Sequence, residues 1–138
     1  MGKQAVINKT CDYMIVDGYN CAQSIIYGMS LIYDEIDIKK RDEYIDIAKT
    51  FGGGVAGLQQ TCGFIIGSNL GYSLIYTDAQ VIKDKVNKIN DLIIDVAGSW
   101  QCEKIIENFN DIEENRRLNC SKILAKIISF IYDDSNKD

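Results

Sequence analysis

Residues 61–76 read TCGFIIGSNLGYSLIY, and their glycines recur at intervals of four, at Gly63, Gly67 and Gly71. Residues four apart lie on the same side of an α-helix, so this spacing predicts a helix from Cys62 to about Tyr76 with one side free of side chains. Each glycine in a helix costs about 1 kcal/mol relative to alanine, so three in register need a structural reason. Two explanations are open. Either another backbone packs closely against this face, or the missing side chains make room for a ligand.

Apolar residues recur at helical spacing over nearly the whole chain of 138 residues, which contains no proline. The pattern predicts further helices at about residues 4–16, 21–33, 37–51, 78–97, 100–109 and 120–132. Alternation typical of strands is rare. We therefore expect an all-α fold, a compact single-domain bundle of five to seven helices over residues 1–138, with a frayed tail at residues 134–138.

The composition limits the kinds of partner. Lys and Arg number 15 against 20 Asp and Glu, and the resulting net charge of −5 argues against a nucleic-acid partner, whose phosphates require clustered basic residues. No apolar run approaches the ~18 residues of a membrane span, and the N-terminus lacks a hydrophobic signal region. We expect a cytoplasmic protein without a membrane partner, and the sequence leaves a homo-oligomer open.

The chain contains five cysteines and no histidine. Four of the cysteines come shortly after a residue type that caps helix N-termini: Cys21 follows Asn20, Cys62 follows Thr61, Cys120 follows Asn119, and Cys102 comes three residues after Ser99. The positive field at a helix N-terminus lowers a thiol pKa from about 8.5 to about 3.5–7.5, and the thiolate is the form that attacks, oxidises or binds metal. The pattern predicts four thiols that the fold brings together as redox thiols or metal ligands.

A structural explanation of the cysteines stays open beside the chemical one. Free cysteine behaves as a small hydrophobic residue, and every cysteine here lies on an apolar stripe. Cys11 lies in the middle of a helix without a cap, so we expect it in the core and apart from the others. The alternative function is then a helical protein-interaction module with structural cysteines, whose glycine face is a docking groove. The absence of histidine excludes a Ser-His-Asp or Cys-His triad and histidine-ligated zinc or haem.

With these motifs in place, the chain resembles the C_GCAxxG_C_C family of redox-active proteins. The resemblance is carried by GYNCAQ at residues 18–23, FGGG at 51–54, TCG at 61–63 with Gly67, Gly98-Ser99 before Cys102, and Cys120 at the start of the last helix. It implies a helical protein whose four cysteines, Cys21, Cys62, Cys102 and Cys120, form a redox or metal site.

The implied cofactor is an iron–sulfur cluster or another cysteine-ligated metal, with disulfides among the same thiols as the variant that needs no metal. Split-Soret cytochromes are similar in this region and carry an iron–sulfur cluster. This chain has no CxxCH motif, so it should carry no haem c, and it has Phe64 where the family pattern usually shows Ala. Cys11 has no counterpart in the pattern. The resemblance implies electron transfer with an unidentified redox partner, and it leaves open whether the protein is an enzyme.

Residues next to these cysteines are candidates for holding the cofactor: Asn20, Gly52, Gly53, Gly54, Thr61, Gly63 and Gly67. Gly63 has no Cβ, so a backbone or a cluster can approach the sulfur of Cys62 closely. The glycine-rich turn at residues 52–57 offers N–H donors as an anion-binding nest. We expect little help from basic side chains, because Lys104 and Lys122 each come two residues after a cysteine and should point away. Backbone N–H groups should therefore balance the thiolate charge.

Overall fold

The computed structural model describes residues 1–109 and 113–137, and the side chains of all of them except residues 113–115. The helices are α1 (Lys3–Ile15), α2 (Cys21–Ile32), α3 (Ile38–Ile47), the 3-10 turn η1 (Ala48–Thr50), α4 (Gly63–Ile75), α5 (Ala79–Ala97), α6 (Cys102–Phe109) and α7 (Glu113–Ser135). The described residues form no strand beyond one isolated bridge between Thr61 and Gln101. The prediction of an all-α bundle is confirmed.

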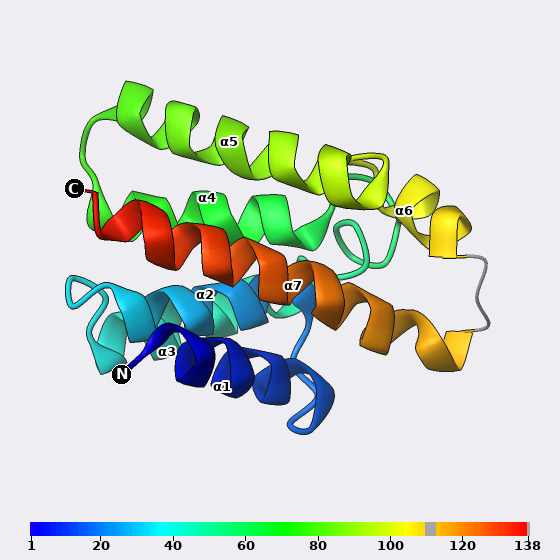
Figure 1. Ribbon diagram of the computed structural model, residues 1–138, viewed down its shortest axis with the longest axis horizontal. Helices are drawn as coiled ribbons and strands as arrows, with labels where there is room; N and C mark the ends of the chain where they lie inside the picture. The colour runs from blue at the N-terminus through cyan, green and yellow to red at the C-terminus, as the bar shows by residue number, and fades with distance from the viewer. Residues whose placement is uncertain (110–112, 138) are drawn as a thin grey trace.

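The helix α7 lies between α5 and α1 in the view of Figure 1. It contacts α1 and α2 on one side and α5 on the other, while α2 also packs against α3 and α4. Both termini lie at one end of the bundle, where Lys3 pairs with Asp133 at 3.2 Å. The glycine-rich loop after η1 and the short helix α6 lie at the opposite end.

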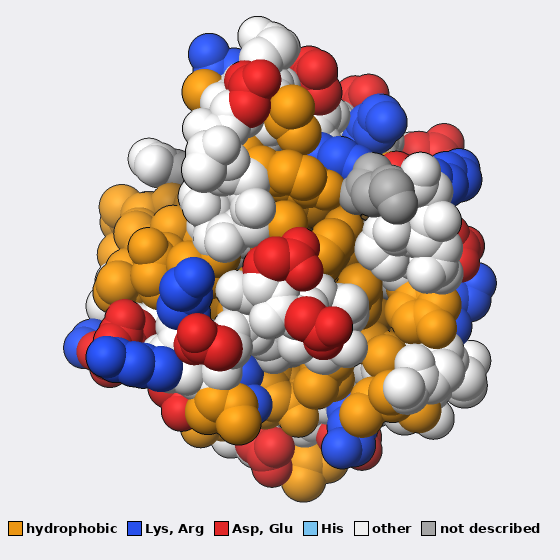
Figure 2. All heavy atoms as spheres, turned by 90° about the vertical axis from the view of Figure 1, so that its left-hand side faces the viewer, with side chains coloured by type: hydrophobic (Ala, Val, Ile, Leu, Met, Phe, Trp, Pro, Cys, Tyr) orange, Lys and Arg blue, Asp and Glu red, His pale blue; other side chains and the backbone are white. Residues whose placement is uncertain are grey.

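The end with the termini carries charges of both signs. Figure 2 looks onto this end and shows Lys and Arg side chains interspersed with Asp and Glu, with apolar side chains between them. The partly buried Lys85–Asp134 ion pair, at 2.8 Å, ties α5 to the last turn of α7. Residues 134 and 135, which the sequence places in a frayed tail, are therefore part of a helix. None of the described helices combines the length and the apolar character needed to cross a membrane.

Side-chain caps begin three of the helices. Asn20 forms a capping box at the start of α2: its side chain accepts from the N–H of Gln23 at 2.8 Å, and the Gln23 side chain accepts from the N–H of Asn20 at 3.1 Å. Asp37 caps α3 and Asp78 caps α5. Gly98 ends α5 with φ 82°, as its position after the apolar stripe predicts.

The glycine face of α4 packs against α2. Gly63 lies opposite Cys21, Gly67 opposite Ala22 and Ile25, and Gly71 opposite Met29. A Cβ on Gly67 would lie 2.6 Å from the carbonyl oxygen of Ala22, closer than real Cβ contacts come. The missing side chains thus allow two backbones to approach, and α2 fills the face that the alternative function would use as a docking groove.

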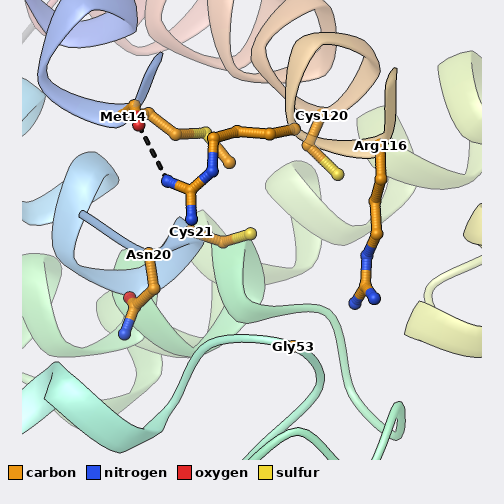
Figure 3. Close-up of a pocket in the computed structure, with 7 residues that line it drawn as sticks. Met14, Asn20, Cys21, Gly53, Arg116 and Cys120 are labelled. Atoms are coloured by element: carbon orange, nitrogen blue, oxygen red, sulfur yellow. Dashed lines mark hydrogen bonds between the residues drawn. The ribbon is translucent and has the colours of Figure 1, made fainter. Parts of the chain in front are cut away.

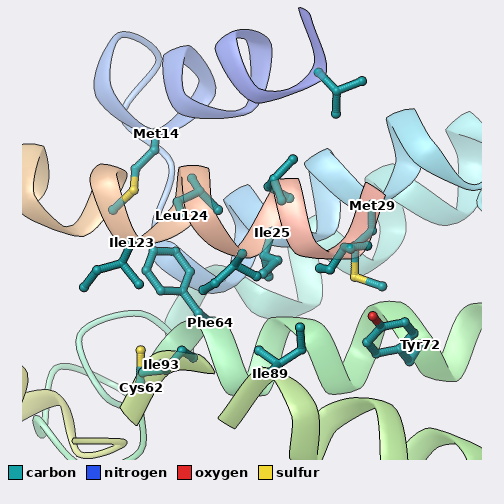
Figure 4. Close-up of a cluster of buried hydrophobic side chains, with 14 of the residues drawn as sticks. Met14, Ile25, Met29, Cys62, Phe64, Tyr72, Ile89, Ile93, Ile123 and Leu124 are labelled. Carbon is teal, nitrogen blue, oxygen red and sulfur yellow. The ribbon is translucent and has the colours of Figure 1, made fainter. Parts of the chain in front are cut away.

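Phe64 from the first turn of α4 occupies the centre of the core near the cysteines. It is 1% exposed and lies among side chains of α2, α5 and α7, including Ile25, Ile93 and Leu124 (Figure 4). Figure 4 also shows Cys62 at the edge of this cluster, beside the loop that precedes α4. The apolar core therefore extends up to the thiol of Cys62.

The last helix begins earlier than the sequence predicts. We expected it to start at Cys120 with Asn119 as its cap, but α7 already begins at Glu113. Residues 113–119 contain no glycine or proline that would end a helix. The helix therefore continues through Asn119, and Cys120 lies in its interior. The predicted third helix is also shorter than expected, since α3 ends at Ile47 and passes into η1.

Replacing Gly67 with alanine tests the close packing of α2 and α4. Because the new Cβ would meet the backbone of Ala22, which cannot move independently, we expect Gly67→Ala to lower the free energy of unfolding by about 3 kcal/mol. Urea unfolding followed by circular dichroism measures the change.

The matched control is Gly71→Ala on the same helix face. Its Cβ would meet only the terminal atoms of the flexible Met29 side chain, so we expect a loss of about 1 kcal/mol or less, offset by the higher helix propensity of alanine. Equal shifts of the unfolding midpoint in the two variants would show that the helices separate freely and would contradict this account.

Candidate functional site

Four cysteines from four helices line one small cavity. Its volume is about 30 Å³, the space of about one water molecule. The cavity is lined by Cys21, Cys62, Cys102 and Cys120, with Gly53, Gly54, Gly63, Phe64, Ile105, Ile106, Arg116 and Ile123. Cys11 lies elsewhere, and its thiol donates to the carbonyl oxygen of Ser121 at 3.6 Å. The structure thus brings together the four sequence-predicted thiols and separates the fifth.

These cysteines do not all hold the same position relative to their helices. Cys21 is the first residue of α2 and follows its capping box, as predicted. Cys102 is the first residue of α6, whereas Cys62 is itself the residue that caps α4. Cys120 lies inside α7. The expectation that all four begin a helix is therefore correct only for Cys21 and Cys102.

A short backbone ladder fixes Cys62 and Cys102 relative to each other. The N–H of Cys62 donates to the carbonyl oxygen of Trp100 at 3.0 Å, and the N–H of Cys102 donates to that of Gln60 at 2.6 Å. Thr61, expected as a cap, instead lies in the bridge with Gln101. The loops before α4 and α6 are thus joined directly at the site.

Stacked tyrosines fix the turn that leads into Cys21. The ring of Tyr13 stacks on Tyr19 at 3.9 Å and on Tyr27 at 4.0 Å, so the turn after α1 is held against both α1 and α2. Asn20 adds a second anchor, because its side-chain amide donates to the carbonyl oxygens of Ala48 and Lys49 at 3.1 and 3.0 Å. The start of α2 is therefore held from two sides.

The glycine-rich loop adopts a left-handed conformation beside Cys21. Residues 53–57 all have positive φ, including Val55 at 66° and Ala56 at 52°. A non-glycine residue in this region costs roughly 1–2 kcal/mol. The loop places the N–H of Gly53 on the sulfur of Cys21, to which it donates a hydrogen bond. The predicted N–H donor is thus present, held by a backbone that costs stability.

Cys21 and Cys120 form a hydrogen-bonded pair. The hydrogen bond from the Cys120 thiol is the largest contribution that lowers the pKa of Cys21. Burial acts in the opposite direction, and the charges of Arg116 and Arg117 and the N–H of Gly53 lower the pKa again. The same hydrogen bond, with burial and the negative charge on Cys21, raises the pKa of Cys120. Cys21 is therefore the thiol of the pair that ionises first, and Cys120 is the one that keeps its proton.

The other thiols stay protonated more strongly than an exposed cysteine. Burial, followed by the negative charge of Cys21, raises the pKa of Cys62 despite hydrogen bonds from the N–H groups that follow it. Burial also raises the pKa of Cys102, although Arg116 opposes it, and the pKa of Cys11. The expectation of four lowered thiol pKa values is wrong for Cys62, Cys102 and Cys120, because burial and the neighbouring thiolate outweigh the helix termini.

Two arginines that the sequence reasoning missed supply positive charge. Arg116 and Arg117 come four and three residues before Cys120 on α7, and both line the site. Lys104 and Lys122 are exposed, as expected. The spacing of the arginines from Cys120 could have revealed them, because residues three and four apart lie on the same side of a helix. That reasoning requires a helix that already includes residue 116. The expected helix start at Cys120 concealed this spacing.

A larger cavity opens on the thiol pair. Its volume is about 350 Å³, and it is lined by Met14, Asn20, Cys21, Gly53, Arg116, Arg117 and Cys120. Figure 3 shows the side chains of Cys21 and Cys120 at this cavity, with Arg116 extending toward it from α7. Cys62 and Cys102 do not line it. A dissolved molecule that enters this cavity thus meets the paired thiols.

The candidate cofactor residues are distributed around both cavities. Gly53, Gly54 and Gly63 line the small cavity, and Asn20 lines the large one. Gly52 packs against the side chain of Asn20, and Gly67 packs against α2 away from the sulfurs. Gly63 does permit a close approach, but of the Cys21 side chain, since an added Cβ would lie 2.9 Å from the Cys21 Cβ.

The four cysteines are suitable metal ligands by residue type, but their sulfurs are not arranged as in a metal site. Four cysteines are the ordinary ligands of an iron–sulfur cluster. Among the described residues, however, no group of three or more Cys, Asp or Glu side chains is arranged to hold a metal ion. The sulfurs also surround space for only about one water molecule. All five cysteines are free thiols. The four thiols thus supply the donor set of a cluster around a narrow cavity.

Comparison with known proteins supports a redox assignment. A family model described as "Putative redox-active protein (C_GCAxxG_C_C)" matches residues 19–133. No curated protein and no solved structure matches the chain. The match spans all four clustered cysteines and ends within the last turn of α7.

Alkylation of the reduced protein should distinguish the thiols. Because Cys21 alone has a lowered pKa, we expect iodoacetamide to label it first and to do so below the pH of about 8.5 at which an ordinary thiol ionises. Cys11 is the internal control, because it is half-buried like Cys21 but has a raised pKa. Mass spectrometry of peptides across a pH series gives the order. Labelling of Cys11 at a lower pH than Cys21 would contradict the assignment.

Removing the cap of α2 should alter the same thiol. Asn20→Ala removes the capping box and the bonds to Ala48 and Lys49, so we expect a loss of about 1 kcal/mol of stability and a raised pKa of Cys21. Asn8→Ala, on the exposed face of α1, is the control. The pH dependence of Cys21 alkylation measures the shift, and identical profiles after correction for stability would mean that the helix start has no influence.

Proposed function

This chain belongs to the C_GCAxxG_C_C family, and from that premise we propose that it transfers electrons through Cys21 and Cys120, which interconvert between two thiols and a disulfide. The observation that carries the proposal is geometric: Cys21 and Cys120 together line both the small and the larger cavity, and the proximity of the two thiols lowers the pKa of Cys21 and raises that of Cys120. The family is described as redox-active, and the pair is the part of the thiol cluster that borders the larger cavity.

The chemistry is thiol–disulfide exchange with a partner disulfide. The Cys21 thiolate attacks one partner sulfur, so an S–S bond forms to Cys21, the partner S–S bond breaks and a partner thiolate leaves. Cys120 then gives up its proton and attacks the Cys21 sulfur. The Cys21–Cys120 disulfide forms, and the second partner sulfur leaves with the proton. Two electrons have passed from the two cysteines to the partner, and the reverse sequence reoxidises a partner dithiol.

The surroundings of the pair support these roles. The N–H of Gly53 and the charges of Arg116 and Arg117 favour the thiolate of Cys21, which is the attacking form. The raised pKa of Cys120 keeps its proton available until Cys21 has reacted. Cys62 is buried and does not border the larger cavity, so in this proposal it takes no part in the exchange.

An iron–sulfur cluster is the second candidate, favoured by the convergence of four cysteines on one cavity. Its ligands would be Cys21, Cys62, Cys102 and Cys120. Because the sulfurs are not arranged to hold a metal, the cavity would have to widen around the cluster. We assign no step of the exchange to it.

One preparation tests both candidates. Protein purified without oxygen is analysed for iron and by absorption spectroscopy, and is then equilibrated with dithiothreitol buffers of increasing oxidising potential. We expect a colourless protein that forms a Cys21–Cys120 disulfide, identified by peptide mass spectrometry. Cys120→Ser should accumulate a mixed disulfide at Cys21, because no second thiol resolves it. Cys11→Ser should behave as the unaltered protein.

Two results would overturn the proposal. Stoichiometric iron with visible charge-transfer bands that disappear in Cys62→Ser would favour the cluster. Thiols that stay unreactive until the protein unfolds would favour cysteines that serve only in packing, and with them the interaction module.

A further inference from the structure

The cavity above the thiol pair is positively lined. Among the described side chains that line it, two are guanidinium groups, those of Arg116 and Arg117, and none is acidic. This composition contrasts with the net charge of −5 of the whole chain. Within the described part of the chain, no carboxylate pairs with either arginine. The cavity therefore concentrates positive charge next to Cys21.

Arg117 is held in place without using up its donors. One of its terminal nitrogens, Nη1, donates to the carbonyl oxygens of Met14 at 2.8 Å and Tyr19 at 3.0 Å. A guanidinium group has five N–H donors, so those on Nε and Nη2 remain for another acceptor. A charged fork that is already ordered loses little entropy when it binds a ligand. Arg117 is thus preorganised to bind an anion.

Arg116 faces the sulfurs from the other side of the site. It lines both cavities, and its Nη2 lies 3.7 Å from the sulfur of Cys102. Arginine binds carboxylates through paired, charge-assisted hydrogen bonds. The volume of about 350 Å³ lies within the range of small-molecule sites, about 300–1,000 Å³. A compact organic anion therefore suits the cavity better than a folded protein surface does.

We propose that this cavity binds a small disulfide that carries a carboxylate near its sulfurs, with the carboxylate on Arg116 and Arg117 and the S–S bond at Cys21. The inference rests on the proposed thiol exchange and names its substrate class. The two cysteines reduce the bound disulfide: their S–S bond forms, the substrate S–S bond breaks, and the substrate leaves as one carboxylate-bearing thiolate and one carboxylate-bearing thiol, which together carry the two electrons and the proton from Cys120.

Three small disulfides of similar size test the charge preference: dithiodipropionate, which is anionic, hydroxyethyl disulfide, which is neutral, and cystamine, which is cationic. The fully reduced protein is mixed with each, and the rate of Cys21–Cys120 disulfide formation is measured. We expect the anionic disulfide to react fastest and the cationic one slowest. For each protein variant, the ratio of the anionic to the neutral rate is compared, because changes in the thiolate fraction of Cys21 cancel in that ratio.

Arg116→Gln and Arg117→Gln should each lower this ratio roughly tenfold, the effect of losing one charged hydrogen bond. Lys122→Gln removes one positive charge from the same helix outside the cavity and should leave the ratio unchanged. Arg117→Lys should recover part of the ratio, because it keeps the charge and loses the fork. Within the described part of the chain, Arg116 donates to the sulfur of Cys102 and to no backbone carbonyl, unlike Arg117. Arg116→Gln therefore keeps the test valid if loss of Arg117 unfolds the protein.

Binding of adipate, a dicarboxylate without sulfur, separates this inference from the proposed function. One outcome is that calorimetry shows adipate binding that is lost in Arg116→Gln, while the protein exchanges no disulfide. That outcome would support anion binding in the cavity and overturn the thiol function. Exchange at equal rates with all three disulfides would support the thiol function and overturn the cavity. Exchange with protein disulfides alone would also overturn it.

Discussion

The close approach of α2 and α4 determines where the thiols lie. Gly63 and Gly67 allow the two backbones to meet, and this contact places Cys21, at the start of α2, beside Cys62, which caps α4. The helix α7 packs against α2 and brings in Cys120. No covalent bond holds the cluster, so its geometry follows from how closely the helices pack. The glycine face of α4 thus determines how close the thiols of Cys21 and Cys62 lie.

Crowding of the sulfurs makes the four cysteines unequal. Two negative charges side by side in a partly buried space repel each other, so one thiolate suppresses ionisation of its neighbours. Cys21 is the one that ionises, because it alone combines a thiol donor, a backbone N–H and two nearby guanidinium groups. The pair of Cys21 and Cys120 therefore shares one proton. Similar residues thereby acquire distinct roles from their surroundings.

Period and spacing were sufficient to predict the all-α fold, the glycine face and the capping of Cys21. They failed where the answer depends on residues far apart in the chain. Asn119 looks like a cap in isolation, and only the helix that precedes it shows otherwise. The same error hid Arg116 and Arg117. The thiol pKa values depend on burial, which local sequence does not reveal, and helix and turn propensities would not place Val55 and Ala56 in a left-handed turn.

The termini and the thiols occupy opposite ends of the bundle. Lys3 meets Asp133 at one end, and the loops that carry Cys21, Cys62 and Cys102 lie at the other. A tether at either terminus would therefore leave the large cavity facing away from the point of attachment. On an electrode or a bead, such a molecule would stand with its sulfurs toward the solution, whichever terminus was anchored.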